Sequence, residues 1–174
     1  ALSAFNIIFS SDVSSNLARY DGIRYGYRAK DYDSLDQLYM KTRKEGFEDN
    51  TKKRILFGTY LLSGNRGRIY YDKALEVRQM LIEEFNNIFN TYDAIIGLSS
   101  SMSAYNINDI KDRKIKDAES LFLTYSNLLG LCSISVPSKN DGMPIGIQFT
   151  ANRFEEQKLY NISQAYERMV NDEL

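Results

Sequence analysis

Residues 14–26 contain the densest group of chemically versatile side chains in the sequence. Two arginines, two tyrosines and Asp21 surround Gly22 and Gly26, directly after an apolar run. Glycine permits positive φ and close backbone approach, and arginine and tyrosine favour stacking and planar hydrogen bonds. Such a set is compatible with catalysis, but side chains of this kind more often hold the shape of a loop. We interpret the segment as a structural loop pinned by stacked arginine and tyrosine side chains.

Ser99, Ser100 and Ser101 form the most prominent candidate nucleophile cluster. A serine nucleophile needs a base within hydrogen-bonding reach. The sequence has no histidine, which excludes a Ser-His-Asp triad and a histidine-ligated metal within this chain. No lysine lies in the stretch and no G-x-S-x-G motif frames it, so we predict a polar loop.

Three other features of the sequence are candidate sites. Arg54 is the best single polar candidate, because a guanidinium can bind a carboxylate through two hydrogen bonds. From composition alone, its position after Lys52 and Lys53 favours a solvated cluster. Residues 63–68 resemble a phosphate-binding loop only faintly and are interpreted as a turn between helices. Cys132 is expected in the core.

Composition limits the classes of protein that the sequence can represent. The chain has 174 residues, is 43% hydrophobic and carries a net charge of −1, which fits one domain or a piece of a larger one. This balance gives no electrostatic signature of nucleic-acid binding. A single cysteine is typical of a reducing compartment, and no apolar run is long enough to span a membrane. Because the chain starts with alanine, we expect a fragment or a processed chain.

Apolar periodicity and capping residues predict a helix-rich α/β protein with about three strands in its second half. Ser34 and Gln37 are expected to cap the second helix, and Asn50 or Thr51 the third. The predicted helices cover residues 2–18, 35–44, 51–63, 69–92, 117–129 and 154–170, and the predicted strands cover 93–97, 133–136 and 145–149.

Several segments also match family motifs in order along essentially the whole chain. The segments are residues 14–26, 45–47, 53–60, 70–78, 127–137 and 142–148. Together they resemble the A-subunit family of glutamyl-tRNA(Gln) amidotransferases, which are amidase-signature enzymes. The resemblance implies the C-terminal part of the amidase-signature fold, a mixed β-sheet flanked by helices, with residues 1–174 belonging to a single domain.

The resemblance implies glutamine hydrolysis, with ammonia passed to a partner subunit that amidates misacylated Glu-tRNA(Gln). The family's Ser–Ser–Lys catalytic set is expected upstream of this chain, so the chain alone is predicted to be inactive. The implied partners are a B subunit plus a small C- or F-type subunit, with the misacylated tRNA reached through the complex. No cofactor is expected on this chain, ATP and Mg being used by the partner subunit. The implied compartment is the bacterial cytoplasm, the mitochondrial matrix or another organelle.

The resemblance alone implies substrate-binding roles for four positions. Arg54 occupies the place of the arginine that binds the substrate glutamine. Ser120 stands where the family has an aspartate for the substrate's amino group, and Asp117, three residues earlier, is a candidate to supply that charge. Phe5 falls roughly where a substrate-side tyrosine is expected.

Two alternatives remain open from the sequence. A non-catalytic scaffold would keep the fold for binding partners, and a general amidase would act on small amides without tRNA.

Overall fold

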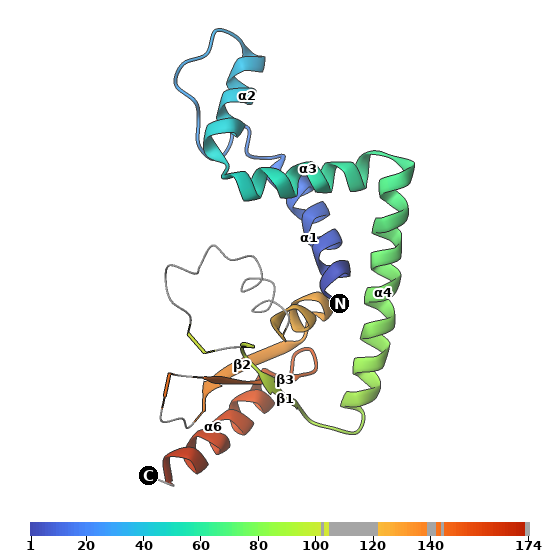
Figure 1. Cartoon of the computed structure of the whole chain (residues 1–174), viewed down its shortest axis with the longest axis vertical. Coiled ribbons are helices and arrows are strands. Elements are labelled where there is room, and N and C mark those ends of the chain that lie inside the picture. The colour runs from blue at the N-terminus through green and yellow to red at the C-terminus, as the bar shows by residue number, and fades with distance from the viewer. Residues whose placement is uncertain (102, 105–121, 139–141, 144, 173–174) are drawn as a thin grey trace. The chain divides into compact units, whose positions relative to one another are not determined.

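The structure, a computed structural model, describes residues 1–101, 103–104, 122–138, 142–143 and 145–172 (Figure 1). Asp117 and Ser120 lie outside these ranges, as do residues 117–121 of the predicted helix at 117–129. The chain divides into two compact units, Asn6–Glu76 and a second unit made of Ala1–Phe5 and Val77–Leu174. The single domain expected from the resemblance stays a prediction.

The Asn6–Glu76 unit is built from helices. Helix α1 spans Leu2–Leu17, α2 spans Leu35–Gly46, α3 spans Asp49–Ser63 and α4 spans Asn65–Phe89. The first residues of α1 and the part of α4 from Val77 onward belong to the second unit. The predicted helices at residues 2–18 and 35–44 are therefore confirmed.

The caps of α2 and α3 differ in how well the sequence predicts them. The Ser34 hydroxyl accepts a hydrogen bond from the Gln37 backbone N–H at 3.3 Å, as predicted, while the Gln37 side chain accepts from the N–H of Asp33. The prediction that Asn50 or Thr51 caps α3 is wrong. That helix begins after Glu48, whose side chain makes no capping hydrogen bond. Asp49 lies in its first turn, where a negative charge interacts favourably with the positive end of the helix dipole.

Glycine determines the junction between α3 and α4. Gly64 is the only residue between the two helices and is extended, with φ −157° and ψ 158°, so the predicted turn at residues 63–68 is confirmed but shorter. Gly67 packs directly against the Tyr60 carbonyl oxygen, where a Cβ would overlap backbone atoms. The absence of a Cβ at this contact permits α4 to start at Asn65, whereas the predicted start is Ile69.

The second unit contains a small sheet. Strands β1 (Ile95–Leu98), β2 (Cys132–Pro137) and β3 (Gly146–Ala151) are arranged in the order β1-β3-β2. Both pairings are antiparallel, so three strands are confirmed, whereas the mixed sheet is not seen within the part of the chain that the structure describes. The reason is positional: β3 lies between β1 and β2, the two strands that run in the same direction.

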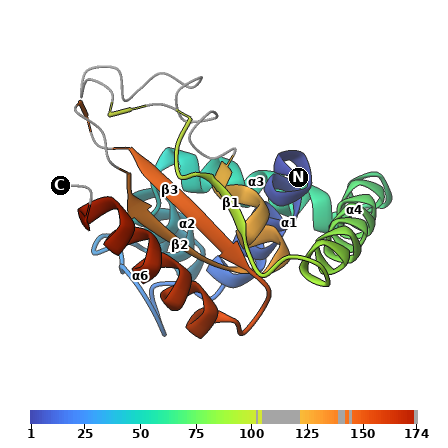
Figure 2. The ribbon, with the colours of Figure 1, turned by 90° about the horizontal axis from the view of Figure 1, so that it is seen from below.

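Helix α6 (Glu156–Asp172) covers one face of this sheet (Figures 1 and 2). Val136, Phe149, Ala151 and Leu159 form the buried cluster between sheet and helix. Cys132 packs against this cluster while only half-buried. Residues 122–129 are helical, and Gly130 ends that segment with φ 68°, the left-handed geometry that glycine tolerates best.

Candidate functional site

Arg54, the principal predicted binding residue, is held over an aromatic ring. It lies on α3, is half-buried, and its guanidinium carbon is 4.8 Å from the centre of the Phe9 ring on α1. Among the described residues no carboxylate forms an ion pair with Arg54. A partly desolvated guanidinium without an acidic partner is suited to bind an external carboxylate.

Close helix packing positions this arginine. A Cβ at Gly58 would overlap the Ser10 carbonyl oxygen and would lie 2.7 Å from the Ser14 Cβ. The glycine therefore lets α3 approach α1 at backbone distance. Arg54, one turn earlier on α3, reaches the Phe9 ring as a result.

Of the other three predicted binding residues, the structure describes only Phe5. Phe5 is half-buried in α1, one helical turn before Phe9. Ser120 and Asp117 lie outside the described residues. The substrate-binding roles of these residues stay predictions.

The loop that follows α1 is organised by one carboxylate. The Asp21 side chain is 12% exposed. One of its oxygens accepts hydrogen bonds from the backbone N–H groups of Ile23 and Arg24, both at 2.9 Å, and the other accepts from Arg24 Nε at 3.0 Å. Because these bonds, led by the Arg24 and Ile23 backbone N–H groups, favour the charged form, they lower the pKa of Asp21 to about 2.

The structural interpretation of residues 14–26 is thus supported, but its mechanism differs from the predicted stacking. Hydrogen bonds to Asp21 fold the segment, and the rings of Tyr20 and Tyr25 meet at a tilted 47° with centroids 6.3 Å apart. The cation–π contact of this loop lies farther along, where Arg28 sits over Tyr32.

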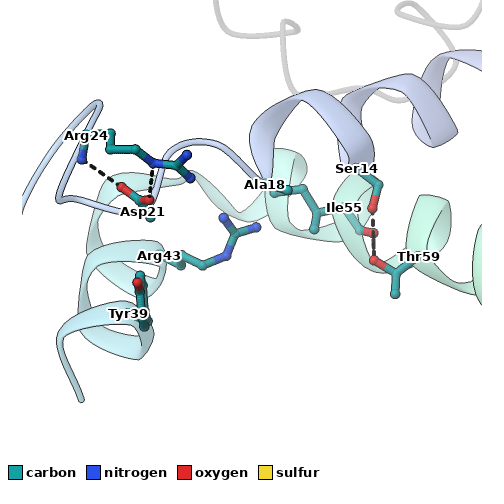
Figure 3. A pocket seen from close by; sticks show the side chains of 8 residues that line it. All are labelled: Ser14, Ala18, Asp21, Arg24, Tyr39, Arg43, Ile55 and Thr59. Carbon is teal, nitrogen blue, oxygen red and sulfur yellow. Dashed lines mark hydrogen bonds and ion pairs between the residues drawn. The ribbon is translucent and has the colours of Figure 1, made fainter. Parts of the chain in front are cut away.

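A hollow of about 430 Å³ opens between this loop and the helices α1, α2 and α3. It is lined by Ser14, Ala18, Asp21, Arg24, Tyr39, Arg43, Ile55 and Thr59 (Figure 3). Arg43 donates from Nη1 to the Leu17 carbonyl at 3.1 Å and places its guanidinium carbon 5.1 Å from the centre of the Phe47 ring.

The lining residues of the loop were predictable as a group, but those of the two later helices were not. Tyr39 and Arg43 are four residues apart on α2 and so share one face of that helix. That spacing was the available signal, but it does not show which other segments the face meets.

Among the described residues, Ser99 of the serine cluster has no hydrogen bond to a basic side chain. Ser99 Oγ lies 2.5 Å from Ser135 Oγ, so its described side-chain partner is another hydroxyl rather than a lysine, aspartate or glutamate. Such a pair lacks the proton acceptor that a nucleophilic serine needs. Within the ranges that the structure covers, no three His, Cys, Asp or Glu side chains gather as a metal site would require. In the same ranges no helix is long and apolar enough to cross a membrane.

Comparison with known proteins identifies the family. A model of the amidase family matches residues 1–160. The chain belongs to the amidase family. Among its relatives, the A subunit of the glutamyl-tRNA(Gln) amidotransferase from Clostridium botulinum (strain Okra / Type B1) is 41% identical over 98% of this chain. The corresponding protein of Listeria monocytogenes serotype 4a (strain HCC23) is 43% identical over 96% of it. The chain spans about a third of these amidase relatives, 36% and 35% of their lengths.

Solved structures agree with the amidase fold. The A subunit of the Thermotoga maritima glutamyl-tRNA(Gln) amidotransferase has 29% sequence identity and a TM-score of 0.56, with 94% of this chain and 33% of that chain covered. An allophanate hydrolase from Kluyveromyces lactis gives a TM-score of 0.68 over 97% of this chain and 25% of that chain, and its 13% identity shows the fold alone. The predicted amidase-signature fold is confirmed.

Proposed function

We propose that this amidase-family chain forms part of the glutamine-hydrolysing subunit of a glutamyl-tRNA(Gln) amidotransferase. The observation that carries the proposal is an identity of 41% and 43% to the A subunits of two glutamyl-tRNA(Gln) amidotransferases over nearly the whole chain. The half-buried Arg54, without an acidic partner among the described residues, supplies a matching binding group.

In this proposal the chain contributes the substrate side of the reaction. The Arg54 guanidinium binds the α-carboxylate of glutamine, and the Phe9 ring beneath it restricts the orientation of the guanidinium plane. Ser120, Asp117 and Phe5 complete the substrate side. The nucleophile that cleaves the amide C–N bond to release ammonia belongs to a Ser–Ser–Lys set outside this chain, so the chain alone hydrolyses no glutamine.

The partners follow from the same proposal. A B subunit, using ATP and Mg, would receive the ammonia and amidate Glu-tRNA(Gln), and a small C- or F-type subunit would complete the complex. The relatives compared above are bacterial, which favours the bacterial cytoplasm over an organelle.

Kinetics of the assembled amidotransferase test the role of Arg54. Hydrogen bonds to a charged group are worth about 1.5–3 kcal/mol, so Arg54→Ala should raise the KM for glutamine roughly 10- to 100-fold. Arg54→Lys keeps the charge but loses the planar fork and should recover only part of the affinity. Lys53→Ala, which removes an exposed cation from the adjacent position, should leave KM unchanged.

The outcomes also separate the alternatives. Unchanged glutaminase kinetics in Arg54→Ala would refute the substrate-binding role and favour a non-catalytic scaffold. Glutamine turnover by the purified 174-residue chain alone would refute its predicted inactivity. Failure to co-purify with B and C- or F-type subunits, together with hydrolysis of simple amides, would favour a general amidase.

A further inference from the structure

The hollow between the loop and α1, α2 and α3 carries more positive than negative charge. Its lining includes two guanidinium groups, those of Arg24 and Arg43, and one carboxylate, that of Asp21. Figure 3 shows both guanidinium groups extending into the same region between the loop and α1. The hollow therefore keeps one uncompensated positive charge among its lining residues.

The single carboxylate is already engaged. Asp21 accepts two backbone hydrogen bonds on one oxygen and the Arg24 Nε–H on the other. It stays ionised at neutral pH and neutralises Arg24 only. No ion pair involves Arg43 in the part of the chain that the structure describes.

Arg43 is half-buried and held in place from two sides. Its Nη1 donates to the Leu17 carbonyl at 3.1 Å, and its guanidinium group contacts the Phe47 ring. A guanidinium carries five N–H donors, so this arrangement fixes the group while leaving most of its donors available. Preorganised donors of this kind lose little entropy when a ligand binds.

Tyr39 adds a neutral donor on the same helix face. It lines the hollow one turn before Arg43. The hydroxyls of Ser14 and Thr59 are instead satisfied by each other at 2.9 Å, with Thr59 also donating to the Ile55 carbonyl at 2.8 Å. The donors left for a ligand are therefore concentrated at the end formed by Arg24, Arg43 and Tyr39.

We propose that this hollow is a binding site for a small oxyanion, a phosphate or carboxylate group carried by a small molecule, held by Arg43 with Arg24 and Tyr39. It is distinct from the Arg54 site. Arg54 is absent from its lining, whereas its neighbour Ile55 is present, and adjacent residues of a helix point about 100° apart. The inference does not depend on the amidotransferase function.

Titration of the purified 174-residue chain with inorganic phosphate, and separately with succinate, tests the site. Isothermal calorimetry at constant ionic strength should show saturable binding, and the preferred anion identifies the ligand class. Arg43→Gln should weaken binding about 10-fold or more, and Tyr39→Phe by a smaller factor. Arg28→Gln is the matched control, because Arg28 is an exposed arginine of the same loop that packs on Tyr32 instead.

Fold integrity is checked by far-ultraviolet circular dichroism. If Arg43→Gln loses structure, Arg43→Lys, which keeps the charge and a donor for the Leu17 carbonyl, and Tyr39→Phe decide the question. Absence of saturable binding to either anion by the unmodified chain would overturn the proposal. So would an equal loss of affinity in Arg28→Gln and Arg43→Gln, because the binding would then reflect general charge.

Discussion

Replacing Gly58 by alanine tests the close packing that holds Arg54 over Phe9. The added Cβ would overlap the Ser10 carbonyl oxygen, with the carbonyl carbon 2.6 Å and the Ser14 Cβ 2.7 Å away. Carbon atoms prefer separations of about 3.5–4.0 Å. Because two of these three atoms belong to the backbone, the strain is not relieved by a side-chain rotation, and α1 and α3 must separate.

The magnitude follows from two opposing effects. Alanine has a helix propensity about 1 kcal/mol more favourable than glycine. Overpacking typically costs about 1–3 kcal/mol, occasionally more, and backbone contacts place this site at the upper end. We expect Gly58→Ala to lower the free energy of unfolding by about 2 kcal/mol.

Urea denaturation followed by far-ultraviolet circular dichroism measures the effect. Gly64→Ala is the matched control, because Gly64 is extended and a Cβ there meets no heavy atom within 4 Å. That variant should change the free energy of unfolding by less than about 1 kcal/mol. If Gly58→Ala proved as stable as the unmodified chain or more so, the close approach of α3 to α1 would be refuted.

Three further substitutions probe the loop and the second unit. Asp21→Asn should lower the melting temperature at neutral pH. The pKa of Asp21 is about 2 in the folded chain and 3.8 ordinarily. The Asp21 carboxylate therefore stabilises the folded chain above pH 3.8, and this stabilisation is lost as pH falls to 2. A gap between the two melting temperatures that stays constant down to pH 2 would contradict this. Gly22→Ala should destabilise by about 1–3 kcal/mol, since Gly22 has φ 77° and a Cβ would lie 2.7 Å from the Thr42 side chain; unchanged urea denaturation would argue against that backbone geometry. Arg78→Ala removes the 2.7 Å bond from Arg78 Nε to the Leu128 carbonyl and should cost about 1–2 kcal/mol, whereas equal stability of the two chains would show that water replaces the bond.

Most helices and all three strands of the described part were predictable from local sequence signals. Ser34, followed by Gln37 three residues later, marks the start of α2, because the capping hydrogen bond joins residues that are close in the sequence. The start of α4 is four residues earlier than periodicity predicts. The contact that permits this start joins Gly67 to Tyr60 of the preceding helix, and apolar periodicity carries no information about such contacts.

In the candidate sites too, contacts within one short segment were predictable and contacts between helices were not. Asp21 and Arg24 lie in one short loop, so their proximity was predictable, although their observed hydrogen bonds were not. Arg43 joins them from a helix that follows in the chain, and its position depends on the packing of three helices. The Phe9 ring beneath Arg54 was not predicted either, because that contact depends on the glycine-mediated crossing of α1 and α3.

Strand β1 has a practical consequence for handling the chain. Within the described residues it pairs only with β3, and it carries Ile96 and Leu98, which are 67% and 46% exposed. Unpaired backbone groups beside apolar side chains offer a template on which strands of other copies can assemble. Self-association through this edge would reduce solubility at high concentration, and a lysine in place of Ile96 is the simplest means of preventing it without altering either candidate site.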